Sequence, residues 1–151
     1  MKYGRTLGRF VPPSIAIGLW IAALYFPAMK VCLSTGKASW WENEIIVGFG
    51  YMGVLAGHFG WFANLALVGW AINLLGGFRS ITWLPLTAFA LGCSGLVPGS
   101  IWDDAGTSGY VCGRGLGFWL WFAATAVPLA NLVVSAFVSS LWRWRLKFQS
   151  V

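Results

Sequence analysis

Charged side chains are scarce in this sequence. Only 9% of its 151 residues are charged, and no more than four are Asp or Glu. A water-soluble domain carries about 25% charged residues, so this chain has too few to cover a surface that faces water. Hydrophobic residues make up 58%, and the mean hydropathy is +0.73. We therefore expect an integral membrane protein whose apolar excess faces lipid.

Groups that carry chemistry are equally few. His58 is the only histidine, and no cysteine or carboxylate stands at ligand spacing from it, so a metal site is not expected. The simpler interpretation of His58 is a neutral ring bonded to a neighbouring helix; a ligand or proton site is the alternative. Asp103 and Asp104 are typical of a solvated loop, with a cation site as the second interpretation. We expect neither an enzyme nor a cofactor.

Four apolar stretches approach the roughly 20 residues that a helix needs to cross a bilayer. They cover about 12–32, 53–76, 81–98 and 116–142. These stretches predict an all-α polytopic membrane protein, with residues 1–151 forming one membrane domain of four transmembrane helices. Segments 33–52 and 99–115 then form outer loops. Residues 45–52 either lie at the interface or, with a break near 57–60, belong to an additional short span.

The positive charges predict an orientation. A four-span arrangement places seven cations on one side, namely Lys2, Arg5, Arg9, Arg79, Arg143, Arg145 and Lys147. Lys30, Lys37, Arg114 and all four acids fall on the other side. The positive-inside rule then puts both termini in the cytoplasm of a bacterial plasma membrane. The chain lacks a basic groove and a basic–aromatic repeat, so nucleic acid is not an expected partner.

Small and amide residues recur at helical spacing in two places. The first stripe contains Gly53, Gly57, Gly60 and Asn64, and the second contains Gly113, Gly117, Ala124 and Asn131. In lipid, helices associate through close backbone approach over small residues and through amide hydrogen bonds. We expect both stripes to pack against protein, either each other or another subunit. A substrate path along them is the alternative.

Two cysteines are expected on the outer side. Cys32 ends the first predicted span, and Cys112 lies in the second outer loop. In an oxidising compartment they can form a disulfide that joins this loop to the first span. Sequence alone does not establish the pairing, and two free thiols are the alternative.

Two segments resemble a known group of proteins. Residues 57–64 (GHFGWFAN) resemble the G-x-x-x-W-x-A-N element of a group of small bacterial inner-membrane proteins, and residues 113–121 (GRGLGFWLW) resemble their G-x-G-[YF]-[YW]-L-W element. The group usually has proline after the asparagine, where this chain has Leu65. The resemblance implies a bacterial four-span protein and implies no activity.

The sequence favours a non-enzymatic protein that binds other proteins. It would be a small subunit of a membrane assembly or an immunity-type factor, in contact with the lipid bilayer and with other subunits or copies of itself. A small oligomeric transporter or channel is the second hypothesis, based on His58, Asn64 and Asn131. A membrane enzyme acting on lipid or quinone is the third.

Overall fold

The computed structural model describes residues 2–42, 59–76, 82–97, 100–102 and 108–149. Its helices are α1 (Lys2–Leu24), the short 3-10 helix η2 (Gly60–Phe62), α3 (Ala63–Gly76), α4 (Trp83–Ser94) and α5 (Leu116–Gln149). Its strands are β1 (Pro27–Leu33), β2 (Ala38–Glu42), β3 (Ser100–Trp102) and β4 (Ser108–Arg114).

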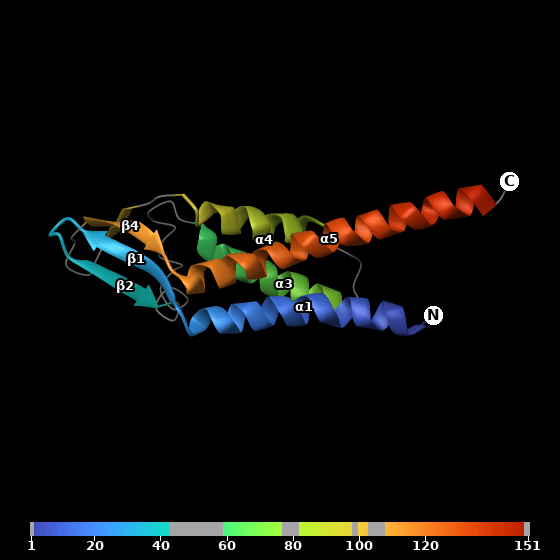
Figure 1. The fold of residues 1–151 in the computed structure, drawn as a ribbon, viewed down its shortest axis with the longest axis horizontal. Helices are drawn as coiled ribbons and strands as arrows, with labels where there is room; N and C mark the ends of the chain where they lie inside the picture. The colour runs from blue at the N-terminus through green and yellow to red at the C-terminus, as the bar shows by residue number, and fades with distance from the viewer. Residues whose placement is uncertain (1, 43–58, 77–81, 98–99, 103–107, 150–151) are drawn as a thin grey trace.

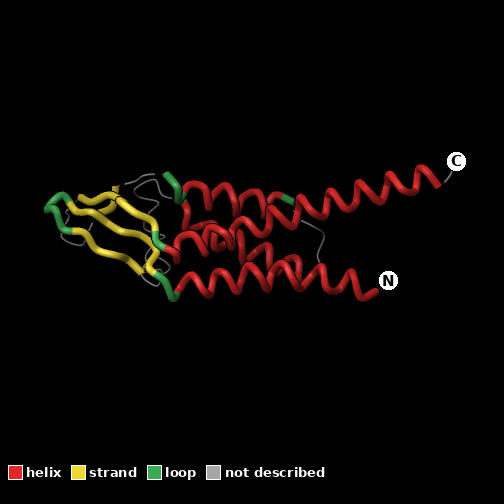
Figure 2. Tube along the Cα trace, viewed as in Figure 1, coloured by secondary structure: helices red, strands yellow, loops and turns green. Residues whose placement is uncertain are grey.

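The helices and the strands occupy opposite ends of an elongated molecule (Figure 1). Helices α1, α3, α4 and α5 run along the long axis as a bundle, and the sheet stands beyond one end of it (Figure 2). Both chain termini lie at the other end. The sheet has the order β2-β1-β4-β3, and each neighbouring pair is antiparallel. Its centre therefore joins β1 to β4, two strands that are far apart in the sequence.

The predicted all-α, four-span architecture is wrong. The segments expected to be outer loops, 33–52 and 99–115, contain strands of a four-stranded sheet. Among the described residues, one helical stretch, Leu116–Trp142, is long and apolar enough to cross a membrane. Phe10–Leu24, Gly60–Gly76 and Trp83–Ser94 are apolar but shorter.

The apolar runs are divided among different kinds of structure, which explains the error. The predicted first span, 12–32, begins earlier, at Lys2, and its helix ends at Leu24. The last residues of the predicted span belong to β1, which starts at Pro27, three residues after α1 has ended. The third predicted span, 81–98, retains only the 12 residues of α4. Hydropathy cannot separate these cases, because a short apolar run suits a buried strand as well as a helix.

The centre of the bundle is built from small and large apolar residues of three helices. Ala16 of α1, Leu67, Trp70 and Ala71 of α3, and Ala124 of α5 form one buried cluster. The alanines let the helix backbones approach closely around the Trp70 ring. This packing fixes α1, α3 and α5 against one another and so positions the end of the bundle that carries the sheet.

Candidate functional site

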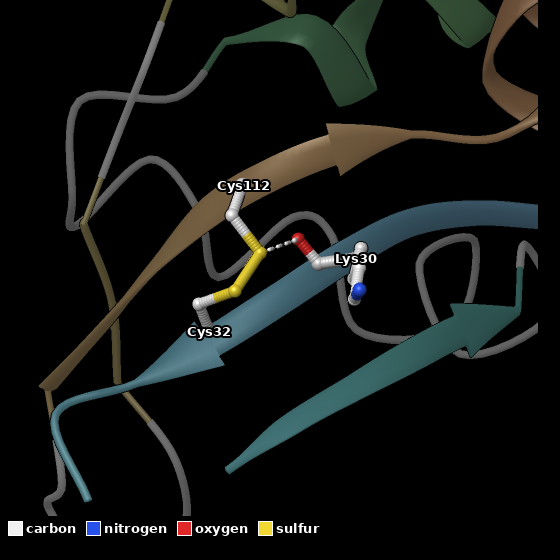
Figure 3. The surroundings of a disulfide bond; sticks show 3 residues. All are labelled: Lys30, Cys32 and Cys112. Atoms are coloured by element: carbon white, nitrogen blue, oxygen red, sulfur yellow. Dashed lines mark hydrogen bonds between the residues drawn. A yellow bond between two sulfur atoms is a disulfide. The ribbon is translucent and has the colours of Figure 1, made fainter. Parts of the chain in front are cut away.

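The two central strands of the sheet are joined by a disulfide. Cys32 of β1 and Cys112 of β4 are bonded, with their Cα atoms 5.8 Å apart (Figure 3). The structure therefore contains the bond that the sequence left open. The strand register shifts between Lys30 and Val31, so that Lys30 pairs with Gly113 while Val31 pairs with Val111. Cys112 is thus the extra residue of a β-bulge, which turns its sulfur towards Cys32.

One face of the sheet carries the disulfide and two exposed aromatic rings. Directly opposed residues of neighbouring strands share a face, and Lys30 pairs with Trp40 while Cys32 pairs with Tyr110. Lys30 and Cys32 themselves share a face because they are two residues apart on one strand. Trp40 is 51% exposed and Tyr110 59%. We call these residues, with Cys112, the disulfide face.

The opposite face is covered. Val31 is 1% exposed, and Gly109, which follows the same alternation, is buried. A Cβ added at Gly109 would stand 3.0 Å from the Leu33 side chain and 3.2 Å from that of Val31. The sheet is therefore half-buried, and its disulfide face is the one that remains accessible.

Arg114, the last residue of β4, connects the sheet to the bundle. Its Nη2 donates to the carbonyl oxygens of Gly95 at 3.2 Å and Leu96 at 2.5 Å, just past the end of α4. A cation there also interacts favourably with the negative end of the helix dipole. The guanidinium carbon lies 5.2 Å from the centre of the Phe118 ring, within the range of a cation–π contact.

Gly115, which follows Arg114, allows the sheet to pack closely at the same junction. Its N–H donates to the Ala28 carbonyl at 2.8 Å. A Cβ at this position would overlap the Pro27 carbonyl oxygen and lie 3.2 Å from the Trp40 ring. Glycine is required here because backbone occupies the space that a side chain would take. Arg114 and Gly115 together hold β1 and β4 at a fixed position over the bundle.

Asn64 forms the polar centre of the bundle near this junction. Its Oδ1 accepts hydrogen bonds from Trp20 Nε1 at 3.1 Å and from Trp121 Nε1 at 2.9 Å. One amide therefore links α3 to both α1 and α5 and satisfies two partly buried indole donors. This arrangement favours the packing interpretation of Asn64 over a substrate path, since its oxygen is engaged by two protein donors.

The other residues of the first stripe are only partly placed. Gly60 is buried in η2, and a Cβ there would stand 3.4 Å from the Gly95 Cα and 3.5 Å from the Trp121 ring. Gly60 thus faces α5 and the end of α4, whereas Asn64 faces α1 and α5. Gly53, Gly57 and His58 lie outside the described residues, as do Asp103 and Asp104.

The second stripe is not continuous. Gly113 lies in β4, where an added Cβ would be 3.4 Å from Lys30 Cβ, so it cannot extend a helical face. Gly117 and Ala124 are buried in α5, and Asn131 is half-buried. The helical part of the stripe packs inside the bundle as far as Ala124, which belongs to the central cluster.

The structure also brings together residues that the sequence did not indicate. Gly92 of α4 faces Thr125 of α5, which is 0% exposed and donates to the Phe122 carbonyl. The sequence indicated Arg114 only as one of the charges on the outer side. A glycine opposite a buried threonine on another helix has no signal in a single sequence, because the pairing depends on how the helices cross.

Comparison with known proteins gives no family. No protein-family model matches the chain, and no curated protein or solved structure is significantly similar to it. Within the part of the chain that the structure describes, no group of three or more His, Cys, Asp or Glu could hold a metal ion. The resemblance of residues 57–64 and 113–121 to small inner-membrane proteins stays a prediction.

Proposed function

We propose that this protein is a membrane-embedded binding protein that recognises a partner protein through the disulfide face of its sheet. The observation that carries the proposal is the sheet itself: a covalently closed platform beyond the end of an apolar bundle, with exposed Trp40 and Tyr110 on its accessible face. Aromatic residues are enriched where proteins bind one another.

The surface of the bundle supports a location in lipid. On α3, Leu65, Val68, Ile72 and Leu75 are 42–60% exposed and recur at three- and four-residue spacing. They form an apolar face opposite the buried Ala63, Leu67 and Trp70. A helix that is apolar on both its inner and outer faces fits an environment of hydrocarbon better than water. Leu116–Trp142 of α5 supplies a stretch long enough to cross the bilayer.

The two ends of the molecule support an orientation. The disulfide requires an oxidising compartment such as the periplasm, and it lies at the sheet end. The terminal segments, with Lys2, Arg5 and Arg9 in α1 and Arg143, Arg145 and Lys147 in α5, lie at the opposite end. By the positive-inside rule this end faces the cytoplasm. The partner would then be a periplasmic protein or the outer part of another membrane protein.

Site-specific photo-crosslinking in native membranes tests the proposal. A crosslinking amino acid replaces Trp40 or Tyr110 on the disulfide face, and Leu65 or Ile72 on the outer face of α3 serves as the matched control. We expect the first pair to give one covalent complex of defined mass, and we expect Trp40→Ala to reduce its yield from position 110. The proposal would be contradicted if positions 40 and 110 gave no complex that the control positions lack, and if the protein purified without a partner and moved a solute in liposomes.

A further inference from the structure

Large apolar side chains are exposed where the bundle meets the sheet. Every helix of the bundle contributes to this surface at its sheet end: α1 through the two residues that follow it, α3 through the residue before η2, α4 through the segment after it, and α5 through its first turn. These residues are 41–80% exposed and are here called the junction collar: Tyr25, Phe26, Phe59, Val97, Leu116 and Trp119.

The composition of the junction collar fits the outer surface of a bilayer. Aromatic residues, which make up most of the collar, concentrate where the hydrocarbon of a membrane meets the headgroups. The collar lies between the apolar bundle and the sheet (Figure 1). With the bundle in lipid, the collar therefore stands in the headgroup layer, which is about 5–7 Å thick on each side of a bilayer. The sheet then begins at the membrane surface.

The disulfide face reaches back to the junction collar. Strand β1 starts at Pro27, and Lys30, which pairs with Trp40, lies about 10 Å further along it. The Trp40 ring extends from there towards the bundle, because a Cβ added at Gly115 would stand 3.2 Å from it. Gly115 directly precedes Leu116 of the collar. Trp40 thus joins the disulfide face to the collar in one exposed surface.

The sheet alone is too small for a stable interface. Strands of three to seven residues, at about 3.3 Å per residue and about 4.8 Å between strands, give a face of about 350 Å² in outline. A stable complex buries about 800 Å² on each partner. Beyond Leu33 the chain turns back through residues 34–37 (STGK), which are polar or glycine, whereas towards the membrane the exposed surface continues into the apolar collar. The area that a partner covers therefore extends over the collar.

The level of the collar determines which kind of partner can cover both surfaces. A water-soluble protein on the collar would have to displace lipid headgroups, whereas an integral membrane protein already occupies that layer. We propose that the partner is a different integral membrane protein, whose outer segment next to a membrane span packs on Trp40 and on the junction collar. This inference rests on the proposed function and names the class of its partner.

Photo-crosslinking of the full chain in native membranes, followed by peptide mapping, tests the inference. The crosslinking amino acid replaces Tyr25 or Leu116 in the collar, or Tyr110 on the disulfide face. We expect all three positions to capture the same protein. The partner peptides captured from positions 25 and 116 should lie directly beside an apolar segment of about 20 residues. The complex should form equally well after an alkaline carbonate wash has removed proteins that are not embedded in the membrane.

A substitution in the collar tests whether the collar contributes to binding. Trp119→Ala removes an exposed ring from the collar and should lower the yield of the complex from position 110 by about fivefold, as expected for an aromatic residue that contributes to an interface. Trp83→Ala is the matched control, because Trp83 is similarly exposed but starts α4 at the other end of the bundle. It should leave the yield unchanged.

Four results would overturn the inference. Loss of the complex after the carbonate wash would mean that the partner is a soluble protein. Phospholipid as the only product at positions 25 and 116, with a protein captured at 110, would mean that the interface ends at the sheet, as would an unchanged yield in Trp119→Ala. A complex of twice the mass of the chain would mean that a second copy covers the face. In each case the disulfide face still binds a protein, whereas no complex at positions 40 and 110 would count against the proposed function itself.

Discussion

The contact between Gly92 and Thr125 predicts a mutational effect that changes sign with its partner. A Cβ at residue 92 would stand 2.5 Å from Thr125 Oγ1 and 3.3 Å from Thr125 Cβ. The hydroxyl cannot easily move away, because it is fully buried, donates to the Phe122 carbonyl at 2.7 Å, and belongs to a β-branched side chain with few rotamers. Helices α4 and α5 must therefore separate when Gly92 is replaced by alanine.

The expected magnitudes follow from two opposing terms. Overpacking of this kind costs about 1–3 kcal/mol, whereas alanine is better than glycine within a helix by about 1 kcal/mol. We expect Gly92→Ala to lower the free energy of unfolding by up to about 2 kcal/mol in the wild-type background. In a Thr125→Ala background the obstructing oxygen is gone, and the same substitution should be neutral or raise the stability by up to about 1 kcal/mol.

Unfolding by sodium dodecyl sulfate in mixed micelles, followed by tryptophan fluorescence, measures both effects. Thr125→Val is the matched control, since it keeps the shape of threonine and should not rescue Gly92→Ala. Gly18→Ala in α1, where an added Cβ would meet nothing within 4 Å, should be tolerated. Equal effects of Gly92→Ala in the wild-type and Thr125→Ala backgrounds would refute the reasoning, because the cost would then not come from this contact.

Three further substitutions test the sheet and its junction. Cys112→Ser removes the disulfide, which closes a loop with a sequence separation of 80. Chain entropy predicts that the free energy of unfolding falls by about 4–5 kcal/mol. The same titration with and without a reductant measures this loss, and an unchanged midpoint would contradict the prediction. Asn64→Leu leaves the indole N–H groups of Trp20 and Trp121 without their acceptor and should lower the free energy of unfolding by about 1–3 kcal/mol. In a Trp20→Phe/Trp121→Phe background, which has no indole donors at these positions, most of that cost should disappear. Arg114→Met removes two charge-assisted hydrogen bonds to the carbonyl groups at the end of α4. It should raise the rate of amide hydrogen exchange in β4 and lower the free energy of unfolding by about 1–3 kcal/mol. Arg114→Lys should recover part of the lost stability, and faster exchange confined to α1 would contradict the role of Arg114.

Local signals in the sequence were sufficient for some of these features. The long helix after Gly115 follows from continuous hydropathy, and Leu116 begins both the predicted span and α5. Cys32 and Cys112 were placed on the same side of the membrane, but the sequence left open whether they form a disulfide or stay two free thiols. Asn64 could be marked as a packing residue because an amide in an apolar segment needs a partner.

The sheet could not be predicted in the same way. Strand β1 (PAMKVCL) continues an apolar run, and the cysteine of its partner β4 lies 80 residues after that of β1, so neither strand carries a local sign of the other. Periodicity also failed for β4, because the bulge at Cys112 breaks its alternation. The two indoles on Asn64 and the carbonyls on Arg114 depend on how distant elements meet, which a single sequence does not encode locally.

The span between Cys32 and Cys112 has a consequence for the order of events during synthesis. β1 and its hairpin partner β2 are complete once residue 42 has been made, but the centre of the sheet must wait for β4. Throughout that interval Cys32 is an unpaired thiol. Cys93, which is free in the folded protein, is synthesised before Cys112, the proper partner of Cys32. A ribosome adding about 5–20 residues per second leaves several seconds in which the wrong bond can form. Correct maturation thus depends on oxidation that is late or reversible, and Cys93→Ser should raise the yield of correctly bonded protein when oxidation is forced early.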